Sequence, residues 1–199
     1  LDFEQTPQWD ALQTTFGDYG QLISDAAVVV ISDYGKGAVE NIEHLIELAS
    51  NANVPVVVDP KGSDFTRYRR ASVITPNLAE FKSVAGPCDS LAILEARARE
   101  LVSDLEIQAL LITLGSDGMV LYLESGEKYQ RSSIARDVYD VSGAGDTVVA
   151  AISVFMAAGL GWPQILEYAN AAAGIVVGKF GTAVVDIDEL KLELNRGRD

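Results

Sequence analysis

Residues 140–147, with the sequence DVSGAGDT, have the composition of an anion-binding loop that opens a helix. The small residues Gly143, Ala144 and Gly145 let backbone N–H groups turn toward an anion, and the N-terminus of a helix adds partial positive charge. Asp146 falls in the first turn of the apolar helix predicted next, where its carboxylate can take the proton of a hydroxyl that attacks a phosphoryl group. The segment therefore predicts a phosphoryl-transfer site, and an ordinary loop with a first-turn acid is the alternative for so short a pattern.

Two more segments place polar residues and glycines just after predicted strands. Asn77 and Glu80 have the spacing of an N-cap residue and the third residue of a helix, which by itself favours a capping box. Thr113, Gly115 and Gly118 end a buried strand in a glycine-rich turn, which by itself favours a hairpin with a positive φ angle. Neither pattern alone distinguishes a structural role from ligand binding.

Two loops carry lysines at the expected carboxyl ends of strands. The segment 32–37, SDYGKG, contains Asp33 and Lys36, and the segment 59–65, DPKGSDF, contains Lys61. Ligands of open α/β sheets bind at this edge, and a lysine supplies a point charge for phosphate. These residues are candidates for phosphate or substrate contact, with solvated lysines in plain turns as the alternative.

The elements that would position these residues alternate along the chain. Apolar runs predict strands at 26–32, 54–59, 72–75 and 109–113, and apolar periodicity predicts helices at 7–24, 41–52, 77–84 and 90–105. A hairpin at 119–123 and 128–133 and helices at 145–158, 162–179 and 188–195 follow. This order predicts an α/β fold with a mostly parallel, doubly wound sheet flanked by helices, plus an antiparallel hairpin. The unbroken apolar run at 26–32 predicts a strand covered on both faces.

Composition limits the partners of the 199-residue chain. The net charge is −14 and the sequence pI is about 4.4, which argues against binding to nucleic acid or to an anionic membrane surface. A single cysteine and a single histidine argue against a disulfide within the chain and against a zinc site. With neither a targeting segment nor a clean membrane span, the sequence predicts a cytoplasmic protein.

The run 140–153, DVSGAGDTVVAAIS, resembles the C-terminal signature of the ribokinase and phosphofructokinase-B superfamily of sugar kinases, position by position. The resemblance implies that Asp146 is the catalytic base and that the backbone of residues 143–145 forms the anion hole. It also implies that Asn77 and Glu80 belong to an Asn-x-x-Glu motif that organises the waters of Mg²⁺ and the phosphates.

The same resemblance assigns three further regions. Thr113, Gly115 and Gly118 would line the ATP site. Asn170, a polar residue within an apolar helix, would lie near the adenosine, with a hydrogen-bonded core amide as the alternative. The loop 178–182, with Asp140, would hold a monovalent cation such as K⁺.

Several segments together resemble the kinase domain of bacterial D-glycero-D-manno-heptose 7-phosphate kinases over residues 1–195: SDYGKGA, DPKGSDFTRYR, TPNLAEF, YDVSGAGDT and NAAAGIVVGKFGT. The resemblance implies ATP, Mg²⁺ and a small phosphosugar as ligands, a homo-oligomer, and in many members a fused C-terminal adenylyltransferase. It implies that residues 1–199 are the C-terminal, ATP-binding portion of one ribokinase-like domain, with the first strands and the lid absent. Another sugar kinase of the superfamily, or a non-catalytic nucleotide-binding module, is the alternative.

Overall fold

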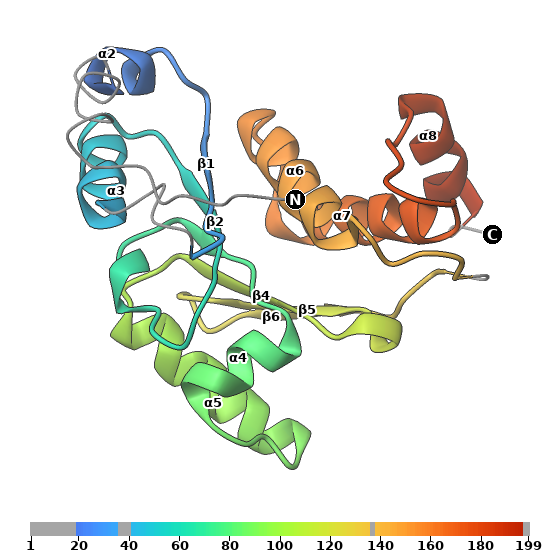
Figure 1. Ribbon diagram of the computed structural model, residues 1–199, viewed down its shortest axis with the longest axis horizontal. Helices are drawn as coiled ribbons and strands as arrows, with labels where there is room; N and C mark the ends of the chain where they lie inside the picture. Colours follow the sequence, from blue (N-terminus) through green and yellow to red (C-terminus); the bar gives the residue numbers. More distant parts are fainter. Residues whose placement is uncertain (1–18, 36–40, 136–137, 197–199) are drawn as a thin grey trace, which may run out of the picture.

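The computed structural model describes residues 19–35, 41–135 and 138–196, which build one six-stranded sheet in the order β1-β2-β3-β4-β5-β6 (Figure 1). The first four strands pair in parallel, and β4, β5 and β6 pair antiparallel. The strands are β1 (Val29–Ser32), β2 (Val56–Asp59), β3 (Val73–Ile74), β4 (Ala109–Thr113), β5 (Met119–Leu123) and β6 (Lys128–Arg131). The predicted mostly parallel sheet with a terminal hairpin is confirmed.

Helices cover both faces of this sheet, as predicted (Figure 1). They are α2 (Tyr19–Ser24), α3 (Ile42–Asn51), α4 (Leu78–Ala85), α5 (Leu91–Asp104), α6 (Ala144–Ala157), α7 (Trp162–Val177) and α8 (Ile187–Arg196), with short 3-10 turns η1 (Thr66–Tyr68) and η2 (Gly115–Asp117). Because side chains alternate along a strand, Val58 and Ile112 pack toward α3, α4 and α5, whereas Val57 and Leu111 pack toward α6 and α7. Of the predicted helix 7–24, only α2 lies within the described residues.

The first strand differs from its prediction. β1 is shorter than the apolar run 26–32, and only one face of it is fully covered: Ile31 is 4% exposed, but Val30 is 47% exposed. Over the residues described, β1 is the last strand on its side of the sheet. The prediction of a strand buried on both faces was therefore wrong, because the described elements do not fully cover the face of the sheet on which Val30 lies.

Two glycines shape the backbone near the carboxyl edge of the sheet. Gly118 has a φ of 92°, and a Cβ atom there would lie 2.0 Å from the carbonyl oxygen of Arg131, so the turn between β4 and β5 tolerates only glycine. Gly143 is the N-cap of α6 with a φ of 78°, a left-handed conformation that turns the chain into the helix. Each glycine thus permits a backbone turn that a residue with a side chain would strain.

A helix that crosses a bilayer needs about 20 consecutive, mostly apolar residues. Within the ranges described, no helix is long and apolar enough to cross a membrane.

Candidate active site

A polar cavity of about 230 Å³ lies where the carboxyl ends of β2, β3 and β4 meet the N-terminus of α6. This is the edge at which open α/β sheets bind their ligands. Its walls are Tyr34, Asp59, Thr75, Asn77, Glu80, Thr113, Gly143, Gly145, Asp146 and Val148. The structure thus brings together segments that lie more than 100 positions apart in the sequence.

Asp146 stands on the first turn of α6, exposed and facing this cavity. The N–H of Ala144 donates to the carbonyl oxygen of Val141 at 3.2 Å, so that group closes the turn before the helix. The amides of Gly145 and Asp146 belong to the first helical turn, which has no carbonyl one turn earlier within the helix to accept from them. Of the predicted anion hole, the part at Gly145 is therefore the best placed to meet an anion.

Asn77 and Glu80 form the capping box that their spacing predicts. The Oδ1 atom of Asn77 accepts from the N–H groups of Ala79 and Glu80, each at 2.9 Å, and the N–H of Asn77 donates to Glu80 Oε2 at 3.0 Å. The other oxygen of Glu80, Oε1, is 3.1 Å from Lys61 Nζ. Because both residues also line the polar cavity, the structural role and a place in the site coexist.

Asp59, at the end of β2, is a site residue that the sequence reasoning missed. Its pKa is raised from 3.8 to about 6, first by burial and then by the negative charges of Glu80 and Asp146, with Lys61 opposing them. Three carboxylates therefore line one cavity, and Lys61 reaches them from outside its wall through the pair with Glu80. The available signal was position alone: Asp59 is the residue at the carboxyl end of a predicted strand.

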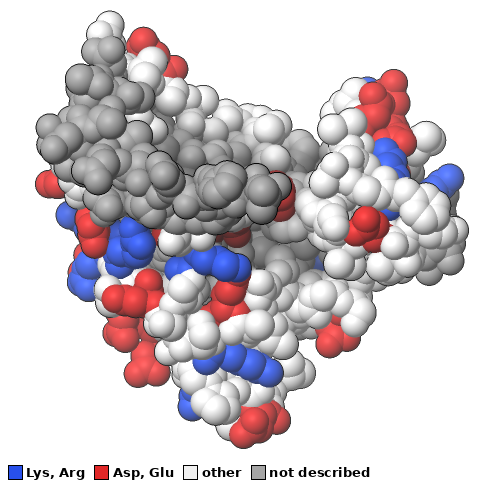
Figure 2. Space-filling model, viewed as in Figure 1, with Lys and Arg blue, Asp and Glu red and all other residues white. Residues whose placement is uncertain are grey.

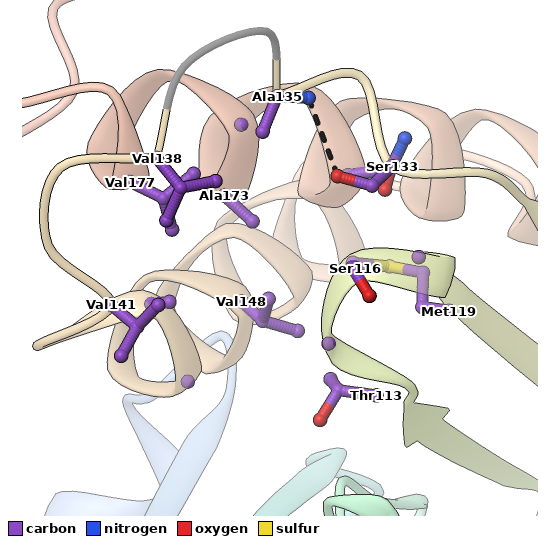
Figure 3. Close-up of a pocket in the computed structure, with 16 residues that line it drawn as sticks. Thr113, Ser116, Met119, Ser133, Ala135, Val138, Val141, Val148, Ala173 and Val177 are labelled. Carbon is purple, nitrogen blue, oxygen red and sulfur yellow. Dashed lines mark hydrogen bonds between the residues drawn. The ribbon is translucent and has the colours of Figure 1, made fainter.

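A second cavity, of about 290 Å³, lies beside the first and is mostly apolar (Figure 3). Val148 from α6, Ala173 and Val177 from α7, and Val138 point into it, and Met119 lies across from them. Thr113, Gly145 and Val148 line both cavities, so the apolar pocket opens directly onto the polar one. The junction has the layout expected of a site that takes a flat apolar ring at one end and a charged group at the other.

The remaining residues predicted for nucleotide contact also line the apolar pocket. Gly115 and Gly118 form its wall at the turn after β4, and Asn170 projects from α7. Asn170 is only 6% exposed, and its Nδ2 donates to the carbonyl oxygen of Ser132 at 2.9 Å. It is thus a hydrogen-bonded amide that fixes the segment after β6 while facing the pocket.

Asp33 and Lys36 are the other residues predicted to contact phosphate or substrate. Asp33 is 6% exposed, lies outside the cavity wall, and accepts hydrogen bonds from the N–H of Gly35 at 2.8 Å and from the hydroxyl of Tyr68 at 2.7 Å. These hydrogen bonds tie the Asp33 side chain to its own loop and to Tyr68, and its contact with phosphate or substrate stays a prediction. Lys36 lies outside the described residues.

Asp140 links the loop before α6 to the loop after α7. Hydrogen bonds from the backbone N–H and the side chain of Ser142, and from the backbone of Gly181, hold the pKa of Asp140 below its usual value. The structure therefore joins the two segments that were predicted to hold a monovalent cation. Across the described ranges, no group of three or more His, Cys, Asp or Glu side chains could hold a metal ion.

The family model described as "pfkB family carbohydrate kinase" matches residues 6–189. The chain belongs to the pfkB family of carbohydrate kinases. Kinases of this family use ATP, which suits a pocket with an apolar end and an anion-accepting end.

Curated relatives of this pfkB-family chain are longer than it is. It is 45% identical over 196 residues to "Bifunctional protein HldE" of Pseudomonas aeruginosa (strain UCBPP-PA14), covering 98% of this chain and 41% of the relative. It is 50% identical over 175 residues to the protein of the same name from Halorhodospira halophila, covering 88% of this chain and 37% of the relative. The chain thus spans about two fifths of the length of these relatives.

Solved structures share the fold. Arabidopsis thaliana ribokinase, complexed with ribose and ATP, superposes with a TM-score of 0.80 at 25% identity, over 89% of this chain and 58% of that one. Phosphofructokinase-2 from Escherichia coli, in complex with potassium, gives a TM-score of 0.81 at 18% identity, over 96% of this chain and 63% of that one. The ribokinase-like fold predicted from the motifs is confirmed.

Proposed function

We propose that the kinase containing this chain transfers the γ-phosphoryl group of ATP to the anomeric hydroxyl of D-glycero-β-D-manno-heptose 7-phosphate, forming the 1,7-bisphosphate. The observation that carries this proposal is the junction at Thr113, Gly145 and Val148, where a pocket for an apolar ring opens onto a cavity that holds Asp146. The choice of sugar is supported by the lysine-bearing loops and by the identity of 45% to the HldE protein over nearly the whole chain.

ATP would lie along this junction. Its adenine fits the apolar pocket between α6, α7 and the turn after β4, where Val148, Ala173 and Val177 supply aliphatic contacts. Its phosphates would then point toward Gly145 and the first turn of α6. That turn offers N–H groups and a favourable dipole to the negative charge of the transferred phosphoryl group.

Asp146 would act as the base. Its carboxylate is exposed to the cavity and sits beside the helix start that receives the phosphoryl group. As the sugar oxygen bonds to phosphorus and the bond to the leaving ADP breaks, the carboxylate accepts the hydroxyl proton. A carboxylate is a weak base, so its contribution is orientation and late proton acceptance.

The acidic side of the cavity suits Mg²⁺ held through water. Mg²⁺ keeps several waters and takes few direct protein ligands. Asp59 and Glu80 would hold its waters. Bound there with ATP, the ion supplies charge neutralisation for the phosphates.

A monovalent cation is proposed next to the anion hole. Asp140 reaches both the loop before α6 and Gly181 after α7, so a cation between these loops would meet a carboxylate of lowered pKa. The phosphofructokinase-2 structure with potassium shares the fold, and we propose K⁺ for this position.

Lys61 is the proposed phosphate contact of the lysine-bearing loops. Its side chain is 55% exposed and currently pairs with Glu80, so it can move to a phosphate with little loss of burial. If Lys61 contacts a phosphate of ATP, its removal raises the KM for ATP. If it contacts the phosphate of the sugar, its removal raises the KM for the sugar phosphate.

We also propose that residues 1–199 form the C-terminal, ATP-binding portion of a single kinase domain. The open face of β1, with Val30 half exposed, and coverage of only 58% of the Arabidopsis ribokinase chain support this division. Exposed apolar side chains such as Val154, Val184 and Ile187 line a groove of about 520 Å³ beside Asp146. On the face shown in Figure 2, charged side chains lie over α4 and α5 and over α8.

The same relatives support a proposal about the full-length protein and its partners. Their printed name, bifunctional protein, supports a fused second activity such as an adenylyltransferase in the full-length gene product. We propose a cytoplasmic homo-oligomer that meets small phosphosugars and ATP.

Product analysis of the full-length gene product tests this function. The enzyme is incubated with Mg²⁺, ATP and, separately, heptose 7-phosphate, fructose 6-phosphate and ribose, and ³¹P NMR identifies the phosphorylated carbon. The expected result is a phosphate on the anomeric carbon of the heptose. Preferred transfer to another sugar, or to another hydroxyl of the heptose, would reject the proposal.

A further inference from the structure

The hydroxyl of Tyr68 sits beneath two loops of the site, at the end of the 3-10 turn η1. The side chain is fully buried, with 0% exposure, and its ring packs against Phe65 at a centroid distance of 5.7 Å. Within this apolar setting the hydroxyl meets polar groups from both loops: Asp33 Oδ2 at 2.7 Å, the N–H of Lys61 at 3.1 Å and the carbonyl oxygen of Lys61 at 3.2 Å.

The donor and acceptor assignment follows from chemistry. A phenol has one proton to give, and the carboxylate of Asp33 is both the closer and the stronger acceptor, so the hydroxyl donates to it. Burial raises the pKa of Tyr68 well above its usual value and keeps that proton in place. The oxygen is then free to accept from the N–H of Lys61. One oxygen atom thus joins the loop after β1 to the loop after β2.

Asp33 connects the Tyr68 hydroxyl to the backbone of the loop after β1. Its Oδ2 atom lies 3.4 Å from an Arg67 nitrogen, and its Oδ1 accepts from the N–H of Gly35. Because Tyr34 lies between Asp33 and Gly35, the bond brackets a residue that lines the polar cavity. The loop after β1 is therefore fixed from below at both sides of Tyr34.

The loop after β2 is held at the backbone of Lys61. Asp59 lines the cavity and Lys61 reaches Glu80 Oε1 at 3.1 Å, and the backbone amide of Lys61 is the group that Tyr68 accepts from. Any movement of this amide would carry the lysine side chain with it. The Tyr68 hydroxyl therefore holds the backbone of the lysine that pairs with Glu80 at the cavity wall.

We propose that Tyr68 is a positioning residue: its buried hydroxyl holds the loops after β1 and β2 in register and thereby places Lys61 for the phosphoryl transfer proposed above, on which this second role rests. Packing alone does not call for the hydroxyl, because the neighbouring ring of Phe65 fills the same core without one. A buried hydroxyl is stable only when it is hydrogen-bonded, and here all of its partners belong to the two loops.

Tyr68→Phe in the full-length gene product tests the first half of the proposal. The informative reporter is the amide of Gly35, which bonds to Asp33 and not to Tyr68, so its hydrogen exchange changes only if the effect travels through Asp33. We expect exchange at Gly35 to accelerate by about tenfold, the factor that one hydrogen bond of ordinary net strength provides. Tyr122→Phe, which also alters a buried tyrosine but in β5, away from the two loops, is the matched control.

A double-mutant cycle tests the second half. If Tyr68 acts through Lys61, Tyr68→Phe should lower kcat/KM by about tenfold in the wild-type background and by less than about threefold in the Lys61→Ala background. An equal loss in both backgrounds, or unchanged exchange at Gly35, overturns the proposal. The cycle is run on whichever sugar phosphate the wild-type enzyme accepts. Activity on a sugar other than the heptose would thus refute the substrate assignment, and the cycle run with that sugar would still test the positioning role of Tyr68.

Discussion

The raised pKa of Asp59 makes a quantitative prediction about stability. The carboxyl has a pKa of about 6 in the folded protein against an ordinary value of 3.8. The folded state therefore binds the proton more tightly than the unfolded state, and ionisation favours unfolding. This cost is absent well below pH 4, grows between pH 4 and pH 6, and is complete above about pH 6.

The size of the cost follows from the two pKa values. Their difference corresponds to at most about 3 kcal/mol. The carboxyl is only partly buried, and discounting for solvent screening leaves about 1 to 2 kcal/mol. Asp59→Asn removes the charge while keeping the shape of the side chain. It should raise the free energy of unfolding by this amount at pH 8 and by about half to two thirds of it at pH 4.5.

Urea unfolding of both proteins at pH 8 and pH 4.5, without metal or nucleotide, measures the effect. Asp25→Asn is the control for net charge, because Asp25 is exposed and precedes β1 at the opposite edge of the sheet. A gain that is equal at the two pH values, or a loss of stability at pH 8, would refute the reasoning. Mg²⁺ with ATP should also stabilise the wild type more than the variant, since the ion offsets the charge that the variant lacks.

Further substitutions separate catalysis, backbone geometry and capping. Asp146→Asn in the full-length kinase should lower kcat by about 10² to 10⁴ with the ATP affinity retained in a binding titration; unchanged turnover would remove the residue from its role as base. Gly118→Ala should lose more than about 2 kcal/mol in urea unfolding, because the added methyl meets the carbonyl of Arg131, whereas Gly126→Ala, with open space, should lose less. Asn77→Ala should lose about 1 kcal/mol through its cap, and an unaltered midpoint would contradict that bond.

Local patterns in the sequence were sufficient to predict the helices and strands and part of the candidate site. The capping box at Asn77 and Glu80 joins groups three residues apart, so its spacing alone predicts the bonds that form. The helix start at Asp146 follows in the same way from small residues ahead of an apolar run. The alternation of strands and helices predicted the parallel sheet, because strands of one sheet that pair in parallel require a crossover between them.

The properties of the cavity depend on groups that come together only in the folded chain. The raised pKa of Asp59 depends on Glu80 and Asp146, which lie far along the chain and approach it only through strand pairing and the packing of α6. Asp33 illustrates the same limit: its hydrogen bond with the hydroxyl of Tyr68, 35 residues away, cannot be read from the loop sequence. The exposed face of β1 depends on which elements pack over that face, which an apolar run does not specify.

The sequence by itself thus determined the order of strands and helices, the capping and anion-binding turns, and the family of kinases to which the chain belongs. Those features depend on hydrogen bonds and periodicities within a few residues, or on motifs read directly along the chain. The tertiary structure alone decided the ionisation of Asp59, the pairing of Lys61 with Glu80 and the hold of Tyr68 on two loops. Burial and Coulomb interactions depend on distances between residues far apart in the sequence, and those distances are set only when the sheet brings the loops together.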